Sequence, residues 1–165
     1  MVVAVILVLT FYTIGLYNKL IDARNRVEDQ FTQIEMELRK KAEYIPKLIE
    51  IINTYTKHEE KIINEVINTK TKIDKANKVN DIIKASKQVN TSINKIYSLK
   101  ETYPELKKNK NLASIEDNIK DIENKINYAR TFYNDAVLNY NNVRCEFPSN
   151  LVAQVFKFKE IDYYK

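Results

Sequence analysis

Apolar residues recur along the chain in steps of three and four, which is the spacing of one face of an α-helix. One series runs from Leu16 to Leu38. The cleanest runs from Leu112 to Val143, with heptad spacing kept over about four repeats. The pattern predicts an all-α protein made of a few long helices.

Breaks in this pattern fall at Pro46, at the polar segment 72–81 and at Pro104. Proline lacks the N–H that a helix needs and disfavours helical angles in the residue before it. The chain therefore either ends a helix near 41–44 or only kinks at Pro46, and Asp81 can cap the helix that follows. We expect helices over about 19–43, 46–73, 81–103 and 111–146, with a short helix over about 149–160. Joined by short connections, these helices predict an up-and-down four-helix bundle with long antiparallel helices; a coiled-coil homodimer is the alternative.

The segment from Met1 to Asn18 carries no charged side chain. Its helix would be roughly 26 Å long, at the short end of what crosses a bilayer. We expect a transmembrane anchor over 1–18 and the bundle over 19–165. A cleaved signal peptide is the alternative, disfavoured because no basic residue precedes the apolar run. The residues expected in lipid are Val2, Val3, Val5, Ile6, Leu7, Val8, Leu9, Phe11 and Ile14.

Basic residues near this segment predict its orientation. Lys19, Arg24 and Arg26 follow it closely, and cytoplasmic flanks are enriched in such residues. We therefore expect a single-pass protein of the plasma membrane, with the N-terminus outside and the bundle in the cytoplasm.

Composition excludes several classes of function. The 27 basic and 22 acidic residues are interleaved, giving a net charge of +5, which is typical of solvated helix faces and not of a nucleic-acid interface. A single glycine leaves no phosphate-binding loop or nucleophile elbow. Cys145 has no partner for an internal disulfide, and we expect it to be a half-buried small apolar side chain.

The residues that carry catalysis or bind metals are sparse. His58 is the only histidine, Ile62 stands where a zinc-protease motif needs a second one, and Tyr55 stands where a di-iron bundle needs Glu. We expect no catalytic residues, no cofactor and no metal. A carboxylate-bridged metal bundle is the least favoured hypothesis.

Two groups of residues are candidates for contact with lipid. In an alternating bundle, the connection after the second helix and the C-terminal segment return toward the anchor. Lysines there would lie near anionic headgroups, and basic residues mixed with aromatic rings are typical of membrane interfaces. The candidates are Lys70, Lys72, Lys75, Lys78, Phe156 and Phe158.

Several short segments together resemble the LemA family of bacterial membrane-anchored proteins. They are Tyr17 to Leu20, Arg24 to Val27, Leu38 to Lys41, Tyr44 to Leu48, Tyr55 with His58 and Glu59, Glu101 to Lys107, Ala129 with Arg130, Tyr133 to Val137, Tyr140 with Asn141, and Phe147 to Ala153. The resemblance implies one short membrane span, a four-helix bundle, no enzymatic activity and no cofactor. It implies an envelope component whose molecular role is undefined.

The matched polar residues have a regular spacing. Tyr133 and Tyr140 lie seven residues apart, and Asn134 and Asn141 repeat that spacing one position on. We expect a hydrogen-bonded layer between the first and fourth helices, with exposed polar flankers as the alternative. The candidate residues of this layer are Arg24, Arg26, Arg130, Tyr133, Asn134, Tyr140 and Asn141.

A turn follows the last long helix. Phe147, Pro148 and Asn150 lie in it, and we expect them to lead into the terminal helix or to act as a docking element. The resulting hypothesis is a non-enzymatic scaffold or adaptor of the cell envelope. It binds membrane lipid through the N-terminal helix and other envelope membrane proteins through the bundle, binds no nucleic acid, and is a possible homo-oligomer. The alternative is a bundle that remodels or tethers membrane by acting on anionic lipid.

Overall fold

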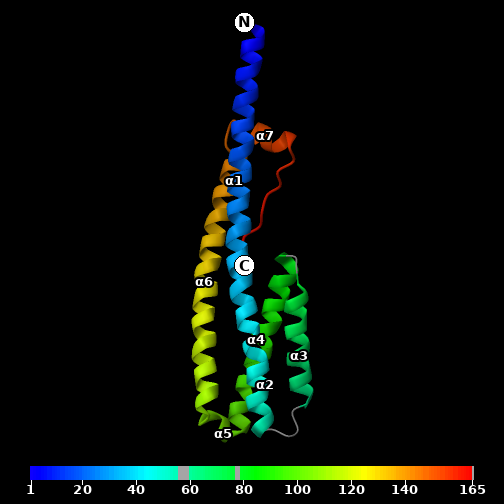
Figure 1. The fold of residues 1–165 in the computed structure, drawn as a ribbon, viewed down its shortest axis with the longest axis vertical. Helices are drawn as coiled ribbons and strands as arrows, with labels where there is room; N and C mark the ends of the chain where they lie inside the picture. Colours follow the sequence, from blue (N-terminus) through cyan, green and yellow to red (C-terminus); the bar gives the residue numbers. More distant parts are fainter. Residues whose placement is uncertain (56–59, 77–78, 165) are drawn as a thin grey trace. The chain divides into compact units, whose positions relative to one another are not determined.

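A computed structural model of the chain describes residues 1–55, 60–76 and 79–164 (Figure 1). Within these residues all regular structure is helical, which confirms the predicted all-α class. The helices are α1 (Val2–Ala42), α2 (Tyr44–Tyr55), α3 (Glu60–Lys75), α4 (Val79–Thr102), α5 (Pro104–Lys107), α6 (Lys110–Cys145) and α7 (Ser149–Val155).

The described residues divide into two compact units. Unit 1 contains residues 1–33 and 128–165, and unit 2 contains residues 34–127. Both α1 and α6 contribute residues to each unit.

The core of unit 1 forms where α1, α6 and α7 meet. The predicted stripes supply it, because an apolar residue every three or four positions keeps one face of each helix out of water. Its buried residues include Leu20, Ala23, Val27, Phe31, Tyr133, Val137, Tyr140, Val143, Val152 and Ala153.

The core of unit 2 has the same origin. Its buried residues include Ile34, Leu38, Ile45, Leu48, Ile52, Val66, Ile73, Ile82, Val89, Ile93, Ile96, Leu106, Leu112, Ile119 and Ile126. Asn109 precedes α6 and caps its N-terminus. Its Oδ1 accepts hydrogen bonds from the N–H groups of Asn111 and Leu112 at 2.9 and 3.0 Å. An asparagine that satisfies free N–H groups in this way is a typical N-cap.

Pro46 interrupts the helical path very little. Only Glu43 separates α1 from α2, and its N–H still reaches the carbonyls of Arg39 and Lys40 at 3.1 and 3.2 Å. Pro46 is the third residue of α2, and because the first N–H groups of a helix have no partner within it, the missing N–H costs α2 no hydrogen bond of its own. The second helix therefore begins at Tyr44, two residues before Pro46.

Two other boundaries differ from the sequence prediction. The helix expected over 46–73 corresponds to two described helices, α2, which ends at Tyr55, and α3, which begins at Glu60, and residues 56–59 between them lie outside the described residues. Exposed Asn53 and Thr54 at the end of α2 are poor helix formers and add no residue to the apolar stripe. The terminal helix expected to reach residue 160 ends at Val155.

Candidate functional site

The C-terminal segment of unit 1 is extended and lies along α6. We call residues 158–164 the tail. Tyr164 is buried, and Phe158 and Ile161 are partly buried. Side chains that project from α6 hold the main chain of the tail.

Two asparagines of α6 bind the tail through both atoms of their amide groups. Asn141 donates from Nδ2 to the carbonyl of Ile161 at 2.9 Å and accepts from the N–H of Ile161 at 3.2 Å. Asn134 does the same with Tyr164, at 3.3 and 2.9 Å. Each side chain thus offers the tail what a neighbouring β-strand would offer, one donor and one acceptor.

The spacing of these pairs follows from helix and strand geometry. Seven residues of helix rise about 10.5 Å, and three residues of extended chain cover about 10 Å. Asn134 and Asn141 are seven apart on α6, and their partners Ile161 and Tyr164 are three apart in the tail. A heptad repeat on the helix therefore matches a three-residue repeat in an extended peptide.

The two tyrosines of α6 repeat this match. The hydroxyl of Tyr140 donates to the carbonyl of Lys159 at 2.7 Å, and that of Tyr133 to the carbonyl of Asp162 at 3.2 Å. Burial, with the nearby Asp162 carboxylate, raises the pKa of Tyr133. Burial also raises the pKa of Tyr140, opposed by Arg24 and Arg144. Both phenols therefore stay protonated and can donate at neutral pH.

Charged and aromatic contacts complete the site. The guanidinium of Arg130 lies over the ring of Tyr164, 4.2 Å from its centroid, and Tyr133 meets the same ring edge-on at 6.4 Å. Arg144 pairs with Glu160 of the tail at 3.1 Å. These groups hold the tail by its main chain and pack the ring of Tyr164 between Arg130 and Tyr133.

The structure therefore brings five of the predicted residues together, Arg130, Tyr133, Asn134, Tyr140 and Asn141. The main-chain partners of the tyrosines and asparagines lie in the tail and not in the first helix, which corrects the expected layer between the first and fourth helices. The sequence prediction missed this because it placed residues 156–160 in a helix. The sequence did contain an indication of an extended segment, because the side chains of Ile161, Tyr163 and Tyr164 favour extended structure.

The remaining candidates of unit 1 lie outside this arrangement. Arg24 pairs with Glu28 on α1 at 3.0 Å and lies close enough to Tyr140 to oppose the rise that burial causes in the pKa of Tyr140. Arg26 is exposed. Pro148 precedes α7 after a cis peptide bond. Asn150 is half-buried, and its Oδ1 has no hydrogen-bond partner among the described residues. Phe147 is exposed.

The end of α6 also corrects one expectation. Cys145 is the last residue of α6, and it is exposed, not half-buried. It lies just past Val143, the last residue of the apolar stripe, so its side chain has no core to enter.

The candidate lipid-facing residues belong to different units. Lys70, Lys72 and Lys75 lie in the last turns of α3 in unit 2, where Lys70 pairs with Asp74 at 2.6 Å. Phe156 and Phe158 lie in unit 1. Lys78 and His58 fall outside the described residues. Among the described residues, no cluster of three or more His, Cys, Asp or Glu is placed to hold a metal ion.

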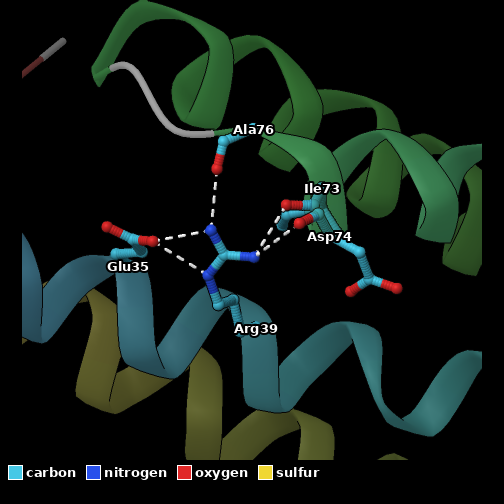
Figure 2. Close-up of polar contacts among 5 residues, drawn as sticks. All are labelled: Glu35, Arg39, Ile73, Asp74 and Ala76. Atoms are coloured by element: carbon cyan, nitrogen blue, oxygen red, sulfur yellow. Dashed lines mark hydrogen bonds and ion pairs between the residues drawn. The ribbon is translucent and has the colours of Figure 1, made fainter.

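Sequence reasoning missed one polar centre of unit 2 (Figure 2). Arg39 of α1 donates to the carbonyls of Ile73 and Ala76 at 2.9 and 2.7 Å, while Glu35 accepts two further bonds from it. The last carbonyls of a helix lack partners within it. Arg39 thus caps the C-terminus of α3 and ties it to α1.

Lys41, two residues further along α1, is buried, with 1% of its surface exposed. Its ammonium donates to Glu123 of α6 at 2.5 Å and to Asn90 of α4 at 2.7 Å. A sequence signal existed, because Lys41 follows Leu38 by three residues and therefore continues the apolar stripe.

These features define a class: an all-α protein with an apolar N-terminal helix and a body that holds its own extended C-terminal tail. The family follows from the sequence. The model of the LemA family matches residues 30–165, most of the chain, and the chain belongs to the LemA family. The match includes Arg39, Lys41, all of α6 and the tail. No curated protein matches the chain.

Proposed function

We propose that this protein is a membrane-anchored, non-enzymatic scaffold or adaptor of the bacterial cell envelope. In this proposal residues 1–18 cross the plasma membrane once, and the remaining helices form an up-and-down four-helix bundle with long antiparallel helices. The bundle binds other envelope membrane proteins.

The observation that carries the proposal is the exposure of the N-terminal part of α1. This helix has a segment long and apolar enough to cross a membrane, and none of that segment is buried. The same helix continues without a break into the stripe of Leu20, Ala23 and Val27, which is buried. A helix that is apolar all round needs an apolar surrounding, and lipid supplies one.

Contacts within unit 2 support the bundle. Lys41 of α1 reaches α4 and α6, Lys95 of α4 pairs with Glu65 of α3 at 2.6 Å, and Lys100 of α4 pairs with Glu116 of α6. The continuous apolar stripe of α6 supports knobs-into-holes packing.

The chemistry of the site in unit 1 supports binding over catalysis. Its asparagines and tyrosines hold the main chain of the tail, and its tyrosines stay protonated at neutral pH as hydrogen-bond donors, which supports a role in recognition. The basic residues Lys19, Arg24 and Arg26 support a cytoplasmic bundle with the N-terminus outside.

Anchoring is tested on the full chain expressed in bacteria and extracted with alkaline carbonate. We expect the wild-type chain to stay in the membrane pellet and Leu7→Lys/Leu9→Lys to move to the soluble fraction. The matched control, Thr10→Ser/Thr13→Ser, changes the same segment without adding charge. Release of the wild-type chain by carbonate would overturn the proposal.

Orientation and partners need separate measurements. A C-terminal tag should resist protease in intact cells and become sensitive once the inner membrane is opened. Crosslinking in cells followed by purification in detergent should return a stoichiometric envelope membrane protein. Recovery of this chain alone would contradict the adaptor role.

A second candidate function is direct action on anionic lipid. The alternation of Phe156, Lys157, Phe158 and Lys159 favours it, because interfacial segments mix aromatic and basic residues. Reconstituted full-length protein would then tether or deform anionic vesicles and leave neutral ones unchanged. Equal behaviour in both kinds of vesicle would contradict this function.

A further inference from the structure

The short helix α7 is apolar on two opposite faces. Ser149, Val152 and Ala153 are buried, and the last two pack with Leu20 and Val143. On the other face Leu151 and Val155 are 54% and 74% exposed. Phe147, just before the helix, is 80% exposed. An outer face of this kind is unusual for a helix in water, where polar residues cover the side away from the core.

The position of α7 indicates what covers this face. In Figure 1, α7 lies crosswise to α1, at the end of α6, beyond which α1 continues alone as the exposed apolar segment. Tyr17 of α1 packs against Phe156 and Phe158, with ring centroids 4.8 and 5.7 Å apart. The outer face of α7 is therefore close to the exposed apolar surface of α1.

Helix geometry gives the depth of α7 relative to the expected membrane. The expected anchor ends at residue 18, so Tyr17 lies in its last turn, and Leu20, which packs with α7, lies about 3 Å beyond it along the helix axis. The headgroup region of a bilayer extends about 5–8 Å beyond its hydrocarbon core. Interfacial helices lie in this region with their apolar face about 5–10 Å deep.

We propose that α7 lies in the membrane plane, with Phe147, Leu151 and Val155 inserted among the headgroups as a second membrane contact beside the anchor. This inference rests on the proposed anchoring by α1. The exposed lysines Lys19, Lys157 and Lys159 lie next to it, so the contact favours anionic headgroups. The anchor then fixes the position of the body, and α7 fixes its tilt.

The test uses the full chain reconstituted in anionic vesicles. The single native cysteine is exposed, so Cys145→Ser allows an environment-sensitive fluorophore to be placed at a chosen position. The label is attached at Val155→Cys, at Leu7→Cys as a marker of the anchor, and at Asn139→Cys as an exposed control on α6. Quencher groups are carried on the lipid, either near the headgroup or deep in the acyl chains.

At position 155 we expect a blue-shifted emission and a several-fold loss of fluorescence with the shallow quencher. At position 7 we expect this loss with the deep quencher, and at position 139 with neither. If 7 is quenched and 155 behaves like 139, the inference fails while the anchoring stands. If 7 is not quenched, the anchoring itself fails. A blue shift at 155 without quenching would mean that protein covers α7, and it would overturn the inference.

Discussion

Asn141 pairs with Ile161 through both atoms of its amide group, although the two residues are 20 positions apart in the chain. The pair fixes the register of the tail on α6, because in an extended chain the N–H and C=O groups of the next residue point away from the side that faces Asn141, so a shift by one residue would lose both bonds. Asn134 repeats the pairing at Tyr164. The tail is thus held by its main chain.

Asn141→Asp should release the tail. A carboxylate keeps the acceptor for the N–H of Ile161 but places a second acceptor against its carbonyl, and a lost or opposed buried hydrogen bond costs about 1–3 kcal/mol. Hydrogen exchange of residues 159–164 and thermal unfolding measure the effect. Asn139→Asp, an exposed change two residues away on the same helix, is the control. Equal losses in the two variants would mean that the pairing does not hold the tail.

The sequence predicted the helical parts of this arrangement and missed the tail. The apolar stripe of α6 was predicted correctly because its residues face a core. Apolar residues three and four positions apart indicate which face of a helix is buried. The partners of Asn134 and Asn141 are backbone groups of an extended segment, and main-chain recognition leaves no side-chain pattern. Arg39 was missed for a related reason, since its partners are the carbonyls at the end of α3.

The end of α7 is a second feature that the side-chain pattern did not predict. Lys157 has φ of 58°, a left-handed conformation that glycine usually provides. The N–H groups of Phe158 and Lys157 return to the carbonyls of Ala153 and Gln154 at 2.9 and 3.3 Å, which is the Schellman pattern. Nothing in the side chain of a lysine predicts this turn, so the sequence prediction extended the helix.

Lys157→Gly should therefore stabilise the protein. An L-residue in the left-handed region carries a strain of about 1–2 kcal/mol, and glycine removes it while the turn is kept. We expect a higher midpoint of thermal unfolding, and a lower midpoint for Lys157→Val, whose branched side chain tolerates this conformation poorly. Lys159→Gly, in the extended tail, should bring no gain. A loss of stability in Lys157→Gly would show that the lysine side chain itself stabilises the turn.

Arg39→Lys should loosen the C-terminus of α3. A lysine keeps the charge but cannot hold Glu35 and the carbonyls of Ile73 and Ala76 at once, because it lacks the planar fork of donors. Hydrogen bonds from a charged group are worth about 1.5–3 kcal/mol each, so hydrogen exchange near the end of α3 should accelerate. Arg26→Lys, at an exposed position of the same helix, is the control. Unchanged exchange at the end of α3 would contradict the capping role.

Tyr97 links stability to alkaline pH. Burial, reinforced by Glu116 and Glu123, raises its pKa above the ordinary value of 10.0. Because the folded state has the higher pKa, the stability from the neutral phenol is complete below pH 10 and is lost as the pH rises above it. We therefore expect the thermal midpoint to fall above pH 10, as Tyr133 and Tyr140 also contribute.

Tyr97→Phe should reduce this alkaline loss. Its buried hydroxyl has no hydrogen-bond partner among the described residues. Removing such a group should keep stability at neutral pH or raise it by on the order of 1 kcal/mol. Tyr128→Phe, at an exposed position, serves as the control. A clear loss of stability at neutral pH would show that the hydroxyl is bonded in solution.

Removing Glu123, the partner of buried Lys41, should lower the stability of the protein more than replacing Lys41 itself. Glu123→Ala leaves a buried ammonium with only the amide oxygen of Asn90, and an uncompensated buried charge is strongly destabilising. Because Glu123 is half exposed, water reduces the loss of stability, and we expect about 1–3 kcal/mol.

Lys41→Met fills the same space without a charge, and it should leave stability nearly unchanged, since apolar replacements of buried ion pairs often do. Denaturant unfolding of both variants measures the difference. The comparison is Glu116→Ala, which removes the partner of Lys100, a lysine whose side chain is 24% exposed against 2% for that of Lys41. If Lys41→Met were the more damaging change, the ion pair itself, and not the avoidance of a stranded charge, would stabilise this part of unit 2.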